Sequence, residues 1–370
     1  MIDTSFLWYA LSSGSMALLG FLLLTEITHA NTRANRWLGI FFLCVAALLT
    51  QLLIESTPQE SNPWYWLIPL LELPRWATFP CFFLALTYFV NPTASSHTLF
   101  WHFIPFFLFC LYAAFVLFPN AYSDARIPFL LPEWAIWIVR HLFLGQAILY
   151  GTLSFLLLRR HQRQIERFSA SIERVNLVWV RLIMYAVLGI TALWILGKSY
   201  PLIAALVPFG YFALTLFMAY HSLNQQVIYP VSQPQLPEVM AAIAVSDKRY
   251  TRLTEDQVHI LQENVHQSVM SEKLYLDPLL NLPLLSEKVG IGTHELSFVL
   301  NQGLGKNFYQ YINELRIEEA KRLLMAPEFQ NKDIASVAIY AGFNSKTTFY
   351  TAFKKMTGMT PKAYLVQSGT

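Results

Sequence analysis

Four charged residues interrupt stretches of the chain that are otherwise apolar: Glu72, Arg75, Arg140 and Arg181. A charge at membrane depth is costly, so such residues usually face a partner or a water-filled cavity. Glu72 and Arg75 are three residues apart, which places them on one helix face where they can form an ion pair. We therefore take Glu72, Arg75 and Arg140 as candidate intramembrane sensing residues. The alternative is structural, either a salt bridge that holds the helices together or arginines that reach the membrane interface.

Prolines surround the first two of these charges. Pro69, Pro74 and Pro80 lie within the same apolar stretch. Proline lacks the amide hydrogen that continues a helix, and its ring clashes with the preceding turn. A kinked or locally open helix is therefore expected around Glu72 and Arg75.

Residue patterns that signal catalysis or metal binding are missing from the sequence. Cys44, Cys81 and Cys110 all lie in apolar stretches and form no metal-binding spacing, which is typical of small buried hydrophobic residues. The sequence contains no nucleophile elbow, phosphate-binding loop, kinase motif or metal-spaced set of histidine and glutamate. We expect no catalytic residue, no metal and no cofactor, so the chain is predicted not to be an enzyme.

Positive charge is concentrated near the C-terminus. The whole chain has a formal net charge of only +3, and residues 255–370 hold 11 basic and 12 acidic residues. Residues 334–370, however, contain Lys346, Lys354, Lys355 and Lys362 and no acidic residue. Any surface that attracts an anion is therefore expected to be local.

The elements that position these residues divide the chain into a membrane part and a soluble part. The chain is 55% hydrophobic and 13% charged, whereas soluble domains carry about 25% charged residues. Residues 1–222 form the predicted transmembrane domain, because they contain seven apolar runs near the length of about 20 residues that a bilayer requires. These runs lie near 5–25, 37–54, 66–90, 99–118, 134–158, 177–197 and 200–220.

Charges in the loops predict the orientation of the seven spans. Seven arginines fall on one side, at positions 33, 36, 159, 160, 163, 167 and 174, and only Arg126 and Lys198 on the other. Positively charged loops stay in the cytoplasm. The prediction is a multi-pass protein of the bacterial cytoplasmic membrane with its N-terminus outside and its C-terminal domain in the cytoplasm.

The soluble part follows a predicted linker at residues 223–254, which is punctuated by Pro230, Pro234 and Pro237. Residues 255–370 show the periodicity of amphipathic helices. Two helix-turn-helix motifs are predicted within them, near 282–302 and 333–356. The fold is thus predicted to be all-α: a polytopic transmembrane helix bundle of about seven spans, followed by a soluble, all-helical double helix-turn-helix domain.

Each predicted motif has a glycine at its turn and a polar residue that can cap its second helix. Gly290 is followed by Thr293, and Gly342 by Ser345. The glycines fit a turn that requires positive φ, and the hydroxyl residues fit helix N-termini. In the second motif, Asp333 is predicted to cap the first helix.

The two motifs repeat the same pattern at a spacing of 52 residues and are separated by an apolar-periodic helix over about 308–325. A helix of 18 residues is about 27 Å long. It can hold two recognition helices near successive major grooves of DNA, which are about 34 Å apart.

Residues 266–367 resemble the AraC/XylS family of bacterial transcription regulators. The most specific similarity runs from Asp333 to Pro361 and on to Tyr364, with further similarity in 285–301 and 305–316. The resemblance implies base and backbone contacts from the second helix of each motif. By motif position the DNA-binding residues are Thr293, His294, Ser297, Phe298, Lys346, Thr347, Tyr350, Thr351, Lys354 and Lys355. Phe298 and Thr351 depart from the family, in which many members carry arginine or another polar residue.

The apolar N-terminal part is similar in layout to the membrane-bound members of that family. The combination predicts a membrane-anchored, sequence-specific transcription regulator that couples a membrane or extracytoplasmic signal to promoter binding. Its expected partners are double-stranded promoter DNA, membrane lipid, a second copy of the chain and an unknown small-molecule or membrane signal. The alternative is a membrane receptor or transporter whose helical C-terminal tail binds protein.

Overall fold

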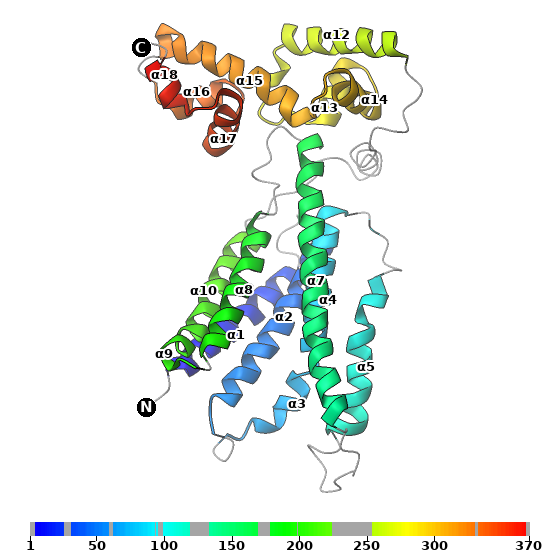
Figure 1. Ribbon diagram of the computed structural model, residues 1–370, viewed down its shortest axis with the longest axis vertical. Coiled ribbons are helices and arrows are strands. Elements are labelled where there is room, and N and C mark those ends of the chain that lie inside the picture. The colour runs from blue at the N-terminus through cyan, green and yellow to red at the C-terminus, as the bar shows by residue number, and fades with distance from the viewer. Residues whose placement is uncertain are drawn as a thin grey trace. The chain divides into compact units, whose positions relative to one another are not determined.

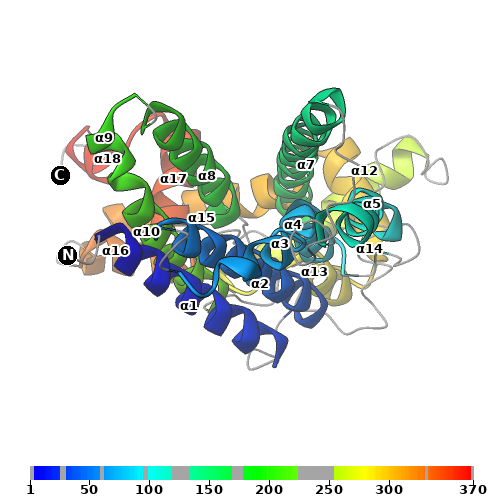
Figure 2. The same ribbon diagram turned by 90° about the horizontal axis from the view of Figure 1, so that it is seen from below.

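The computed structural model describes the chain except residues 1–3, 26–30, 59–61, 93, 95–98, 119–132, 169–177, 198, 224–253, 330–331 and 368–370. The described residues form helices and no strand (Figures 1 and 2), as predicted. They separate into two compact units, Met1–Arg159 with Leu177–Val227 and Arg160–Asn176 with Ile228–Thr370. The predicted linker at 223–254 lies almost entirely outside the described residues.

The first unit is a bundle of apolar helices. Its longer helices are α1 (Thr4–Leu24), α2 (Thr32–Glu55), α4 (Arg75–Val90), α5 (Ile104–Tyr112), α7 (Glu133–Phe168), α8 (Val178–Gly197) and α10 (Leu206–Leu223). Shorter segments are η2 (Tyr65–Leu67), α3 (Ile68–Leu71), η3 (Leu99–Phe103), the π-helical η4 (Ala113–Leu117) and α9 (Pro201–Ala204).

Five described helices are long and apolar enough to cross a membrane, and they fall on five of the seven predicted spans. The prediction at 66–90 is instead a helix pair, Tyr65–Leu71 and Arg75–Val90, bent by 42°. The prediction at 177–197 corresponds to α8, a helix of 20 residues, in which Trp179–Ile190 is the apolar stretch among the described residues. By length and composition the described residues support five spans, or six with the bent pair, and the seventh span, at α8, stays a prediction.

Helix α2 is the centre of the bundle and packs against α1 on one side and α4 on the other (Figure 1). Where α1 and α2 cross, a Cβ atom on Gly20 would lie 2.9 Å from the backbone oxygen of Gly39, and the reverse contact is also 2.9 Å. The two helices approach this closely because neither residue has a side chain. In the middle of α1, the hydroxyl of Ser13 and that of Thr50 on α2 hydrogen-bond at 2.6 Å.

Proline explains the bend between α3 and α4 and creates a polar contact further along α4. Pro74 lies in the turn that separates the two helices. Pro80 lies inside α4 and has no amide hydrogen to donate to the carbonyl of Trp76, four residues earlier. The side chain of Gln146 on α7 donates to that carbonyl at 3.1 Å instead. The kink expected from the prolines is confirmed.

Large apolar side chains cover the outer surface of this unit. Phe21 is 61% exposed, Phe115 71% and Leu188 66%. Water would make such exposure unfavourable over so many helices, whereas hydrocarbon chains carry no such penalty. The surface therefore suits a lipid environment.

The second unit contains the predicted paired motifs. Its helices are α12 (Glu255–Ser271), η5 (Leu274–Leu276), α13 (Leu282–Val289), α14 (Thr293–Phe298), the π-helical η6 (Val299–Gly303), α15 (Phe308–Met325), η7 (Pro327–Phe329), α16 (Ile334–Tyr340), α17 (Lys346–Thr357) and α18 (Pro361–Gln367). Helix α15 joins a group formed by α12–α14 to a group formed by α16–α18 (Figure 1).

Each group has its own hydrophobic core, and α15 contributes to both. Phe308 and Ile312, in the first half of α15, pack with Leu285, Leu296 and Leu300 of the first group. Ile317, Ala320 and Leu324, in its second half, pack with Phe343, Phe349 and Phe353 of the second group. The two motifs are thus attached to opposite halves of one helix.

Candidate nucleic-acid interface

The second motif is held by caps that the sequence predicted. The carboxylate of Asp333 accepts hydrogen bonds from the amide of Ser336 at 2.8 Å and from its hydroxyl at 2.6 Å. Both hydrogen bonds lower the pKa of Asp333, and the one from the hydroxyl has the larger effect. Gly342 has φ +88° at the turn, and the hydroxyl of Ser345 accepts from the amides of Thr347 and Thr348 at the start of α17.

Helix α17 has one buried and one exposed face. Phe349 and Phe353 are fully buried in the second core. Five predicted DNA-binding residues are exposed on the other face: Lys346, Thr347, Thr351, Lys354 and Lys355. Tyr350 is half-buried against the core, and the ammonium of Lys346 lies 5.7 Å from its ring centre. This face offers hydroxyl and ammonium donors, which suit base edges and phosphates.

In the first motif, fewer of the predicted DNA-binding residues are exposed. Gly290 has φ +74° at the turn, as expected. Thr293 is only 9% exposed, and its hydroxyl donates to Ser286 at 3.3 Å. Ser297 is 7% exposed. His294 and Phe298 are half-exposed.

The predicted cap of α14 is wrong. Gly292, and not Thr293, is the N-cap residue, and no side-chain hydrogen bond caps the helix. The Thr293 hydroxyl faces the interior, toward the Ser286 hydroxyl, which itself donates to the carbonyl of Ile291. Thr293 therefore connects the second helix of the motif to the first, at Ser286 of α13.

Sequence reasoning missed Arg316, which lies at the middle of α15 and is completely buried. Its Nε donates to the carbonyl of Tyr275 and its terminal nitrogen to the carbonyl of Asp277, each at 2.7 Å. Its guanidinium carbon lies 5.6 Å from the ring centre of Phe343 in the second motif. Burial lowers the pKa of Arg316 to about 10, so the side chain is still charged at neutral pH.

Gly342 approaches the same segment from the second motif. A Cβ atom at this position would lie 2.6 Å from the carbonyl oxygen of Tyr275 and 2.8 Å from the Cα of Leu276. Residues 274–277 are therefore contacted both by Arg316 and by the turn of the second motif. The signal available in the sequence was an arginine in an apolar stripe, four residues after Ile312 and four before Ala320.

The candidate sensing residues of the first unit are not joined in an ion pair within the described part of the chain. Glu72 lies in the bend between α3 and α4 and accepts a hydrogen bond from Gln51 at 3.4 Å. Arg75 begins α4, and its guanidinium carbon lies 4.3 Å from the ring centre of Phe143. Arg140 belongs to α7, but its side chain lies outside the described residues.

Metal binding has no support in the described residues, where no group of three or more histidine, cysteine, aspartate or glutamate side chains can hold an ion.

Comparison with known families agrees with this geometry. Residues 285–367 match a family model described as a helix-turn-helix domain. This range begins in α13 and ends with α18, so it includes both motifs and the helix that joins them. The C-terminal part of the chain is a helix-turn-helix domain.

Proteins named as transcription regulators are similar to part of this chain. An uncharacterised HTH-type transcriptional regulator of Staphylococcus aureus strain COL is 30% identical over 154 residues, which is 35% of this chain and 20% of the relative. Another, from Pseudoalteromonas carrageenovora, is 32% identical over 85 residues, which is 23% of this chain and 48% of the relative. The chain therefore spans about a fifth of the length of the staphylococcal relative. No solved structure matches.

Proposed function

We propose that this protein is a membrane-anchored, sequence-specific transcription regulator of the AraC/XylS type, with a DNA-binding domain in the bacterial cytoplasm. One observation carries the proposal: a single helix, α15, holds two helix-turn-helix motifs, and the exposed face of α17 bears lysines and threonines. The relatives named as transcription regulators support it. We propose no catalytic activity for the chain.

The two motifs contribute unequally in this proposal. Lys346, Thr347 and Thr351 approach base edges from α17, while Lys354 and Lys355 approach phosphates. Tyr350 packs on a sugar or a thymine methyl group. In the first motif, His294 and Phe298 are the more accessible pair, and Thr293 and Ser297 support them from within. The second motif then supplies most of the direct readout.

Membrane anchoring is proposed from the apolar helices and from the side chains that they expose to the surroundings. The low overall charge of the DNA-binding domain favours weak binding by one copy, and two copies in one membrane raise the effective concentration of binding sites. We therefore propose a homodimer. Glu72, Arg75 and Arg140 are the proposed sensing residues.

The proposal is tested by selection from genomic DNA. Full-length protein in detergent is incubated with sheared genomic fragments at about 150 mM salt, and the bound fragments are sequenced. A bipartite sequence with its halves about one helical turn apart is the expected result. The control carries Lys346→Ala and Thr347→Ala, both at exposed positions, so its fold is preserved. If the wild-type protein enriches no sequence over this control, a receptor or transporter whose tail binds protein is favoured instead.

Signal coupling has a separate test. We propose that a signal in the membrane part passes through residues 223–254 and α12, with a change in dimer geometry. Replacing 224–253 by a flexible Gly/Ser segment of equal length is expected to leave affinity for the selected site unchanged. Regulation of a reporter promoter that carries the site is expected to become constant across growth conditions. A reporter response identical to that of the wild-type protein would contradict the coupling.

A further inference from the structure

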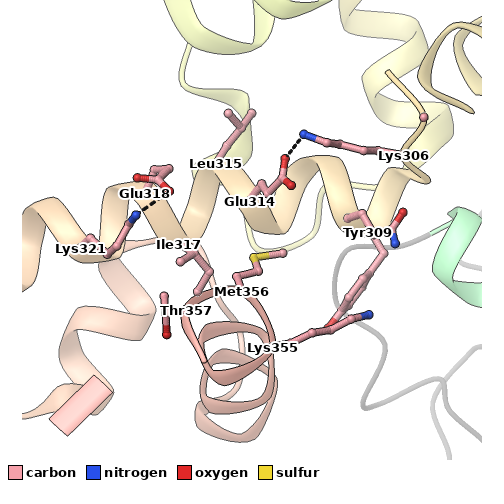
Figure 3. A pocket seen from close by; sticks show the side chains of 12 residues that line it. Lys306, Tyr309, Glu314, Leu315, Ile317, Glu318, Lys321, Lys355, Met356 and Thr357 are labelled. Atoms are coloured by element: carbon pink, nitrogen blue, oxygen red, sulfur yellow. Dashed lines mark hydrogen bonds and ion pairs between the residues drawn. The ribbon is translucent and has the colours of Figure 1, made fainter. Parts of the chain in front are cut away.

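A groove of about 650 Å³ runs along α15 in the DNA-binding unit. One end is formed by Gly305 and Lys306, just after the first motif ends in η6. Lys355–Thr357, the last turn of α17, also line the groove. Figure 3 shows Glu314 and Glu318 of α15 between Lys306 and Lys321, with Lys355 beside Tyr309. The groove therefore occupies the interval between the two motifs.

Three lysines line this groove, and two of them are held by carboxylates of α15 (Figure 3). Lys306 forms an ion pair with Glu314, and Lys321 forms one with Glu318 at 2.7 Å. Among the described residues, Lys355 takes part in no ion pair. The side chains of Lys306 and Glu314 are 39% and 43% exposed. Ion pairs this exposed are weak and exchange readily with other partners.

We propose that this groove binds the sugar-phosphate backbone of the DNA that lies between the two half-sites. The inference rests on the proposed DNA binding. Lys306, Lys321 and Lys355 neutralise phosphates, and Glu314 competes with DNA for Lys306. A duplex that contacts α14 and α17 together must span this interval, because residues just after the first motif and residues of the second motif both line the groove. Lysines spread along a groove fit an extended polyanion better than a compact ligand.

Phosphate contacts have two measurable properties that contacts to bases lack. They carry no sequence information, so their loss weakens specific and unrelated DNA by the same factor. They also release counterions, so each lost contact lowers the slope of log affinity against log salt by about one. Competition by Glu314 adds a third property, because removing its charge strengthens DNA binding.

The experiment measures fluorescence anisotropy of two labelled duplexes with full-length protein in detergent between about 50 and 200 mM salt. One duplex carries the site enriched in the genomic selection, and the other has the same composition in scrambled order. Lys306→Ala and Lys355→Ala are each expected to weaken binding to both duplexes about 3- to 10-fold. Each is also expected to lower the slope of log affinity against log salt by about one. Glu314→Gln is expected to raise the affinity for both duplexes about threefold.

Two controls separate the groove from general charge effects. Glu319→Gln makes the same charge change on α15, but Glu319 pairs with Arg322 and does not line the groove. It is expected to change affinity much less than Glu314→Gln. In the background of Lys306→Ala, Glu314→Gln is expected to lose its effect, because its competing lysine is missing. An equal gain in both backgrounds would show general repulsion and overturn the competition.

Failure of the groove and failure of the proposed function give different results. Normal binding of the selected site by wild-type protein, with unchanged slopes in both lysine variants, would overturn the groove alone. If the wild-type protein bound neither duplex, both the proposed function and the proposed DNA binding in the groove would be wrong. Circular dichroism of each variant verifies the fold, which surface substitutions of this kind leave intact.

Discussion

A single buried arginine contacts both residues 274–277 and the second motif. Arg316 comes from α15, donates to the carbonyls of Tyr275 and Asp277, and lies against Phe343. A buried charge is tolerated only where its hydrogen bonds are satisfied. The contacts of the guanidinium therefore require one arrangement of residues 274–277 relative to the second motif. Any change in the angle between the motifs disturbs these contacts.

Replacing Arg316 by leucine is expected to destabilise the DNA-binding unit by about 2–5 kcal/mol, because two buried carbonyls lose strong donors. The measurement is hydrogen–deuterium exchange of the full-length protein, followed over residues 272–280 and 340–345. Protection there should fall by about tenfold or more. Arg322→Leu is the matched control, since Arg322 is exposed on the same helix and forms an ion pair with Glu319. Equal exchange in the two variants would contradict the role of Arg316.

Gly342→Ala is expected to combine two penalties, the strain of positive φ and a clash with the carbonyl of Tyr275 at 2.6 Å. Gly358→Ala separates them, because Gly358 has φ +78° and nothing within 4 Å of the added Cβ. Positive φ alone costs about 1 kcal/mol for alanine, so the substitution at Gly342 should cost at least about 2 kcal/mol. The same exchange measurement compares them. Similar losses in both variants would mean that the turn moves freely away from residues 274–277.

At the scale of the element, helix ends in the DNA-binding unit were predictable because their causes are local. The helix Phe308–Met325 has the predicted bounds, and Asp333 and Ser345 cap as expected. Capping depends on residues within one turn, which the sequence displays directly. The partners of Arg316 are 39 and 41 residues away, so its role depends on the tertiary fold. For the same reason, the inward direction of the Thr293 hydroxyl was not visible in the sequence.

The crossing of α1 and α2 predicts an element-scale effect of substituting glycine in the membrane unit. Gly39→Leu is expected to separate the helices, because its Cβ would lie 2.9 Å from the backbone of Gly20 and 3.0 Å from Leu24. Overpacking of this kind costs about 1–3 kcal/mol. A lower midpoint of thermal aggregation in detergent measures the effect. Gly145→Leu on α7, with nothing within 4 Å, is the control and should change the midpoint far less.

At the scale of the whole molecule, the number of membrane crossings decides whether the DNA-binding unit can meet DNA. Among the described residues, five helices and one bent pair are long and apolar enough to cross, and α8 contributes the apolar stretch Trp179–Ile190. With the N-terminus outside, six crossings place the C-terminus outside, and seven place it in the cytoplasm. Arginine-rich residues 159–176 favour the cytoplasm for the loop before α8. DNA binding therefore requires that α8 and α10 either both cross or both stay inside.

We expect both helices to cross, which places the turn between α8 and α9, at Ser199, outside the cell. Alkaline phosphatase, which is active only outside the cytoplasm, should be active when fused after Ser199 and inactive when fused after Arg167. A fluorescent protein that folds only in the cytoplasm should fluoresce when fused after Thr370. Inactive phosphatase at Ser199 with fluorescence at the C-terminus would mean that α8 and α10 form a hairpin on the cytoplasmic side. Active phosphatase at Ser199 without fluorescence at the C-terminus would place the helix-turn-helix domain outside, where it cannot regulate transcription.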